Sequence, residues 1–176
     1  ILQEFLPKLG LQKNLERPIE FYPTELPVAL ENAILIFPHS RRAEKQWPYF
    51  NELTASLLNL NLQSPIVWMG TGELGPIDLA WPAERFVNLI NRLPLQALPT
   101  AIAASKLVIA NDSGPMHLAA AMGKEVLALF GPTSPKLYGP YPLEDPQHHI
   151  LEAPHGELAQ LSTQTVVEAI LTLLSR

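Results

Sequence analysis

Short apolar runs that alternate with helical spacing constrain the fold of this chain more than any other feature. The expected strands are 33–37, 65–69, 87–90, 107–110, 126–130 and 148–151, of which the third and the last have the weaker patterns. The expected helices are 48–59, 95–105, 115–122 and 163–175. Strands that are apolar on nearly every residue are buried on both faces. We therefore predict an α/β fold, in which a parallel sheet is covered by helices on both faces.

The length of 176 residues fits one ordinary domain, which we place at residues 31–176. Ahead of it, residues 1–9 have the spacing of an amphipathic helix, and residues 17–31 carry three prolines that are typical of an extended connector. Residues 1–30 are therefore expected to be an interdomain helix and connector. Because Ile1 is no initiator methionine and no signal peptide follows it, we expect a fragment of a longer protein.

Composition excludes several classes of function. The net charge of −5 leaves no basic footprint, so no nucleic acid partner is expected. There is no cysteine, which excludes disulfides and zinc–thiolate sites. No apolar run approaches the ~20 residues that a membrane-spanning helix needs.

The unusual chemistry of the chain is concentrated in four loops that follow expected strands. These loops are 38–47, 70–76, 111–117 and 131–141. In a parallel sheet the carboxyl ends of the strands lie at one edge, and ligands bind outside that edge. The four loops are therefore expected to surround one site.

An anion site is predicted where the strand 107–110 gives way to the helix 115–122. Pro115 suits the first helical position, because its missing N–H is not needed there, and Gly114 is then the expected N-cap. The backbone amides of Gly114, Met116 and His117 would have no partner within the helix. Aligned peptide dipoles add about half a positive charge at this end, so the site suits a phosphate or diphosphate.

Two side chains of the same segment have alternative interpretations. Asp112 either accepts a hydrogen bond from a sugar hydroxyl or a loop amide, or it caps the helix. His117, in the first helical turn, either donates to a phosphate oxygen or is a buried histidine bonded to backbone. No second histidine pair has ligand spacing, so no metal site is expected. His148 and His149 are expected at the surface.

The remaining loops offer cations, glycines and a carboxylate. Loop 38–47 carries Arg41, Arg42 and Lys45, which could stabilise a departing diphosphate, while its Trp47 is expected to pack rather than to stack on a ligand. In Gly70-Thr71-Gly72-Glu73, the glycines allow close backbone approach and Glu73 could accept from a ribose, although the segment is equally compatible with an ordinary turn. The glycines and prolines of 131–141 either line the pocket or form a rigid connector.

These motifs together resemble glycosyltransferase family 9, the heptosyltransferase family. The resemblance rests on four segments in the order and spacing of the family: Lys45-Gln46-Trp47-Pro48, Gly70-Thr71-Gly72-Glu73, the run from Asn111 to Ala121, and Leu129-Phe130-Gly131-Pro132-Thr133 with Gly139-Pro140. It covers about residues 30–142. It implies a Rossmann-like domain that is one half of a GT-B enzyme, the half that binds the donor.

The resemblance also implies an activity and the residues that serve it. Members of the family transfer a heptose from ADP-heptose to lipopolysaccharide core with inversion, and they require neither a metal nor a cofactor. The donor-binding residues implied by the resemblance are Ser40, Arg41, Lys45, Glu73, Asp112, Ser113, Gly114 and His117. Arg41 stands where the family has a threonine-like residue. Lys45 and His117 would stabilise the leaving group, and the general base, an aspartate, lies in a first domain that this chain lacks.

We therefore predict the donor-binding half of an inverting glycosyltransferase of lipopolysaccharide or other surface polysaccharide synthesis, inactive by itself. Its partners would be a nucleotide sugar, with ADP-heptose expected, and a lipid- or polysaccharide-linked acceptor bound through the missing domain. The expected location is cytoplasmic, with peripheral association of the full-length protein at the inner face of the plasma membrane. The alternatives are a non-catalytic nucleotide-sugar-binding module and a sugar-nucleotide epimerase of GT-B form.

Overall fold

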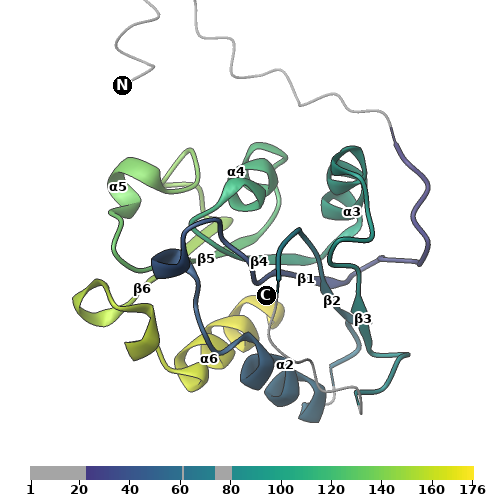
Figure 1. Cartoon of the computed structure of the whole chain (residues 1–176), viewed down its shortest axis with the longest axis horizontal. Helices are drawn as coiled ribbons and strands as arrows, with labels where there is room; N and C mark the ends of the chain where they lie inside the picture. The colour runs from purple at the N-terminus through teal and green to yellow at the C-terminus, as the bar shows by residue number, and fades with distance from the viewer. Residues whose placement is uncertain (1–22, 61, 74–80) are drawn as a thin grey trace, which may run out of the picture.

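The computed structural model describes residues 23–60, 62–73 and 81–176, and in these ranges it contains one six-stranded sheet (Figure 1). Its strands are β1 (Ile34–Phe37), β2 (Ile66–Trp68), β3 (Phe86–Asn88), β4 (Leu107–Asn111), β5 (Val126–Phe130) and β6 (His148–Glu152). Their order is β3-β2-β1-β4-β5-β6, and every neighbouring pair is parallel. This is the order of a Rossmann-like sheet, which confirms the predicted fold class.

Helices cover both faces of the sheet (Figure 1). The α-helices are α2 (Phe50–Asn59), α3 (Leu98–Ala104), α4 (Gly114–Ala121), α5 (Pro135–Tyr138) and α6 (Thr163–Leu174). Short 3-10 segments lie at Ala43–Lys45, Leu95–Ala97, Pro154–Gly156 and Leu158–Gln160. Helices α2 and α6 pack on one face, and α3 and α4 pack on the other.

Alternation along each strand divides the core into two layers. Ile34 and Ile36 of β1 pack in the layer that contains α2 and α6, whereas Leu35 and Phe37 pack in the layer that contains α3 and α4. All four side chains are buried, which is why the strand is apolar on consecutive residues. The α4 layer contains small residues such as Ala119, which let this helix lie close to the sheet.

Several local expectations differ from the structure. The predicted helix 95–105 is divided into a 3-10 turn and α3, because Pro99 at the start of α3 has no N–H to continue the first turn. The predicted loop 131–141 contains the one-turn helix α5. The third strand occupies Phe86–Asn88 rather than 87–90, and no helix precedes it in the described residues from 81 onward.

The expectation that His148 lies at the surface is wrong. Its side chain is buried, and Nδ1 lies 2.6 Å from the carbonyl oxygen of Pro142 in the segment that leads into β6. His149 is partly buried, with Nε2 lying 3.1 Å from Glu125 Oε1. The predicted helix at 1–9 and part of the connector at 17–31 lie outside the described residues. From residue 23 to 30 the described chain contains neither a helix nor a strand.

Candidate functional site

A cavity of about 780 Å³ opens at the carboxyl ends of β1, β2 and β4. Strands β1 and β4 are neighbours in the sheet. After β1 the chain continues to β2 on one side of this pair, and after β4 it continues to β5 on the other side. The loops after such a pair diverge and leave a crevice, which is the usual ligand site of an open parallel sheet. The volume is in the range of sites for small molecules and cofactors.

The cavity has a charged part and an apolar part. Arg41, Arg42 and Lys45 line the charged part, where Asp112 is the one carboxylate among the described lining residues. The apolar part is lined by Phe37, Met69, Leu89, Leu93, Leu95, Leu98 and Leu118. A ligand that combines an anionic group with a flat or apolar group would match both parts.

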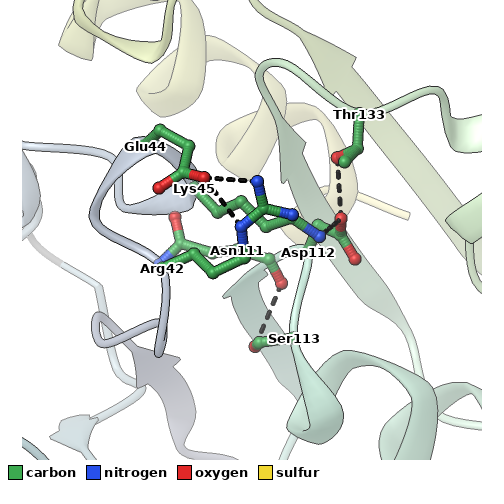
Figure 2. A network of polar contacts seen from close by, with 7 residues as sticks. All are labelled: Arg42, Glu44, Lys45, Asn111, Asp112, Ser113 and Thr133. Carbon is green, nitrogen blue, oxygen red and sulfur yellow. Dashed lines mark hydrogen bonds and ion pairs between the residues drawn. The ribbon is translucent and has the colours of Figure 1, made fainter.

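Asp112 is the centre of a polar network in the charged part (Figure 2). Lys45 Nζ donates to Asp112 Oδ2 at 2.5 Å, and the Thr133 hydroxyl donates to the same oxygen at 2.7 Å. The Lys45 side chain is 14% exposed and that of Asp112 7%, so water competes little for the pair. Lys45 Nζ also lies 5.5 Å from the ring centroid of Tyr138, which adds a cation–π contact.

The interpretation in which Asp112 caps α4 is wrong. The N-cap of α4 is Ser113, and no side chain caps this helix. The Asp112 carboxylate is held instead by Lys45 and Thr133, both of which come from loops after neighbouring strands. Asp112 is therefore oriented by tertiary contacts and not by the helix that follows it.

Asn111 fixes the loop after β1 to the end of β4. Its Oδ1 accepts from the Trp47 amide at 3.0 Å, and its Nδ2 donates to the Pro38 carbonyl at 3.1 Å. Asn111 is fully buried, so these bonds satisfy groups that water cannot reach. Sequence reasoning gave Asn111 no role, although a polar residue at the end of an apolar strand could have indicated one.

Trp47 packs rather than lining the cavity, as expected. Its side chain is buried and its indole N–H donates to the Leu161 carbonyl at 2.8 Å. The ring makes edge contacts with Tyr49 and Phe50. The loop that carries Lys45 is therefore anchored in the core immediately after that lysine.

The start of α4 lies one residue earlier than the sequence predicted. Ser113 has extended backbone angles and is the N-cap, so Gly114 is already the first helical residue and Pro115 the second. The sequence predicted a Met116 amide without a partner. In the structure this amide donates to the Ser113 carbonyl at 3.1 Å, so that prediction is wrong. A side chain on Gly114 would meet no protein atom within 4 Å of its Cβ. The helix end therefore faces open space in the cavity wall.

The structure brings together most of the predicted site residues. Those that line the cavity are Ser40, Arg41, Lys45, Asp112, Ser113 and Gly114. Glu73 and His117 are exposed and are not among the lining residues. The alternative in which His117 is a buried, backbone-bonded histidine is therefore wrong.

The glycine loop after β2 forms part of the cavity wall. Gly70 and Gly72 have φ of +117° and +144°, a region in which side chains are strained. A Cβ on Gly72 would also lie 2.4 Å from ring atoms of His39. The Asn91 side chain holds both backbone groups of Gly72, accepting from its N–H at 3.1 Å and donating to its carbonyl at 2.9 Å. Glycine is required here for close packing of two loops.

The loop after β5 forms packing contacts rather than cavity wall. A Cβ on Gly131 would lie 2.7 Å from Leu158 Cγ, and one on Gly139 would lie 2.4 Å from the Pro135 carbonyl oxygen. No residue of 131–141 lines the cavity. The rigid-connector interpretation is therefore the one that the structure favours, with Thr133 as the residue through which this connector reaches Asp112. Sequence reasoning assigned Thr133 no role.

The described ranges contain neither a candidate metal centre nor a candidate membrane span. No three histidine, aspartate or glutamate side chains there are grouped so that they could hold a metal ion. No helix in those ranges has the length and apolar character to cross a membrane.

The parallel sheet and the site at its β1–β4 crevice define a Rossmann-like α/β domain. The family model of glycosyltransferase family 9 (heptosyltransferase) matches residues 6–170, so the chain belongs to this family. Lipopolysaccharide heptosyltransferase 1 of Escherichia coli (strain K12) is 24% identical over 156 residues, which are 88% of this chain and 48% of that protein.

Two solved structures show the same fold. One is E. coli heptosyltransferase WaaC with ADP, with a TM-score of 0.72 and 23% identity, covering 97% of this chain and 54% of that chain. The other is WaaC with ADP-2-deoxy-2-fluoro heptose, with a TM-score of 0.64 and 22% identity, covering 84% of this chain and 45% of that chain. The chain spans about half the length of the curated relatives it matches.

Proposed function

We propose that this chain is the donor-binding part of an inverting glycosyltransferase and that its cavity binds ADP-heptose. The observation that carries the proposal is the meeting of an uncapped α4 N-terminus with Lys45 and Arg41 in one cavity. The N-terminal end of α4, with its Gly114 amide, and two cations beside it, the mostly buried Lys45 and the exposed Arg41, together favour a diphosphate. Two related structures hold ADP and an ADP-heptose analogue, which supports the choice of ligand.

Each part of the donor has a matching part of the cavity. The diphosphate lies against the Gly114 amide, with Lys45, Arg41 and the Ser40 hydroxyl beside it. The base occupies the apolar part, and Asp112 accepts a hydrogen bond from a sugar hydroxyl, since a carboxylate beside a phosphate would be repelled. Glu73 binds the ribose and His117 the diphosphate, both from the exposed rim outside the cavity lining.

The chemistry follows from where charge develops. As the acceptor hydroxyl attacks the anomeric carbon, the bond to the diphosphate breaks and the bonding electrons move onto a phosphate oxygen. The α4 dipole and Lys45 stabilise that oxygen, and His117 adds a further donor. The general base and the acceptor site belong to a preceding domain, so residues 1–176 alone transfer no sugar. The acceptor is lipid- or polysaccharide-linked, and the whole protein works in the cytoplasm at the inner face of the plasma membrane.

Titration calorimetry of this chain with ADP-heptose, a UDP-sugar and ADP tests the proposal. We expect ADP-heptose to bind more tightly than ADP, and the UDP-sugar to bind more weakly than both. Equal and tight binding of ADP and ADP-heptose would favour a simple nucleotide-binding module. Conversion of ADP-heptose to an epimer would favour an epimerase. Absence of binding, or sugar transfer by this chain alone, would contradict the proposal.

A further inference from the structure

Thr133 contacts the proposed donor site through a single atom. Its hydroxyl donates to Asp112 Oδ2 at 2.7 Å (Figure 2). Thr133 itself does not line the cavity. The residue follows β5, and its loop is packed against Leu158 through Gly131. Thr133 can therefore act on a ligand only through Asp112.

Both donors to Asp112 meet at one oxygen. Lys45 Nζ and Thr133 Oγ1 bond to Oδ2, and no hydrogen bond within the described residues engages Oδ1 (Figure 2). A carboxylate held by two donors on one oxygen keeps the other oxygen free as an acceptor. The network thus leaves Oδ1 as the oxygen that can accept from a ligand in the cavity.

The two donors differ in what a bound diphosphate does to them. Lys45 is a cation in the charged part of the cavity, so a diphosphate competes with Asp112 for its ammonium group. Thr133 carries no charge and lies outside the cavity lining, so the ligand leaves its bond to Asp112 intact. After donor binding, Thr133 is the contact that still determines the orientation of the carboxylate.

We propose that Thr133 is a positioning residue that selects sugar nucleotides over plain nucleotides. By holding Oδ2, it presents Oδ1 of Asp112 to a hydroxyl of the sugar while Lys45 turns to the diphosphate. This inference rests on the proposed function and adds to it the source of discrimination for the sugar. Plain ADP makes no use of Asp112 Oδ1, so its affinity is independent of Thr133.

The test measures the affinities of ADP-heptose and ADP for this chain and its Thr133→Val and Thr133→Ser variants. Valine keeps the shape of threonine and removes the donor, so Thr133→Val should lower the affinity for ADP-heptose about tenfold and leave that for ADP within about twofold. Thr133→Ser keeps the hydroxyl and should restore the preference. Thr172→Val is the matched control, because the Thr172 hydroxyl donates to a carbonyl on the exposed side of α6 at 2.9 Å.

The outcomes separate this inference from the proposed function. Loss of both affinities to the same extent in Thr133→Val, or no loss, overturns the positioning role while the donor site stands. Failure of the unaltered chain to bind either ligand overturns both. Should Thr133→Val not fold, a crystal structure of the unaltered chain with ADP-heptose replaces this measurement. We expect the Thr133–Asp112 hydrogen bond to persist and a sugar hydroxyl to donate to Asp112 Oδ1. An Asp112 carboxylate that has turned away from Thr133 overturns the inference.

Discussion

Helices α4 and α6 both begin after a serine N-cap, and they use that serine in opposite ways. In α6 the Ser162 hydroxyl oxygen accepts from the Thr165 amide at 3.1 Å, which satisfies a donor of the first turn. In α4 the Ser113 hydroxyl donates backward to the Asn111 carbonyl at 3.2 Å and caps nothing. The end of α6 is closed by its own side chain, whereas the end of α4 is open toward the cavity.

The difference between the two helices shows how a fold can leave the N-terminus of a helix accessible to a ligand. An N-cap contributes about 1 kcal/mol, and α4 forgoes this contribution. Its position is secured instead by its buried residues Met116, Ala119 and Ala120 and by the contacts of Asn111 just ahead of it. Contacts away from the N-terminus of α4 therefore stabilise the helix, and the N-terminus itself remains accessible to a ligand.

The largest expected effect is at Asn111, which supports the open end. Asn111→Ala leaves the Trp47 amide and the Pro38 carbonyl without partners in a buried place, so the free energy of unfolding should fall by about 2–5 kcal/mol. The control is Asn91→Gly, which removes a similar pair of bonds at an exposed residue and should cost less than about 1 kcal/mol because water replaces them. Urea unfolding measures both, and equal losses would contradict the role given to Asn111.

Filling the open end should abolish binding without unfolding the protein. Gly114→Leu places a side chain where no protein atom lies within 4 Å of the new Cβ, so the affinity for ADP should fall at least about 100-fold, or ~2.7 kcal/mol. Thr163→Leu makes the matching change at the first residue of α6 and should leave ADP affinity unchanged. Calorimetry and thermal unfolding together check this. If Gly114→Leu bound ADP as tightly as the unaltered chain, the diphosphate would not lie at the N-terminus of α4, and the proposed site would be wrong.

Removing the cation beside the open end should have a somewhat smaller effect. Lys45→Met removes a charge-assisted hydrogen bond to the diphosphate worth roughly 1.5–3 kcal/mol, which is about a tenfold to 100-fold loss of ADP affinity. Lys106→Met is the matched control, because Lys106 is exposed, immediately precedes β4 and does not line the cavity. The control should change ADP affinity less than about threefold, since it removes the same charge far from the ligand, where salt screens it. An equal loss in both variants would show that net charge, and not a contact of Lys45, is responsible.

The smallest expected effect distinguishes the two serines directly. Ser162→Ala should lower the free energy of unfolding by about 1 kcal/mol, because it removes the cap of α6. Ser113→Ala should lower it by less than about 0.5 kcal/mol, because there is no cap to lose and only one weak contact is removed. Chemical denaturation of the ligand-free variants gives both values. If Ser113→Ala were the more damaging change, α4 would be capped in solution.

The pattern of the sequence predicted the framework of this fold well and its contacts poorly. Apolar runs located β1, β2, β4 and β5 to within a residue, because a doubly covered strand must be apolar on both faces. The cap of α4 was missed by one residue, since Ser113 and Gly114 are both acceptable N-caps and only the backbone angles decide. The burial of His148 was missed because β6 is polar at its start, and nothing in the pattern shows that the irregular segment before it, at Pro142, folds back onto this side chain.

For the site, local sequence determined which groups are present and at which edge of the sheet they lie. Strand polarity and the order of the loops are enough for that, because parallel strands end together. Only the tertiary structure decided that Lys45 and Thr133, respectively 67 and 21 residues away from Asp112 along the chain, bond to the same oxygen of its carboxylate. Such contacts depend on which strands become neighbours, and strand order is set by packing of the whole core rather than by any local segment.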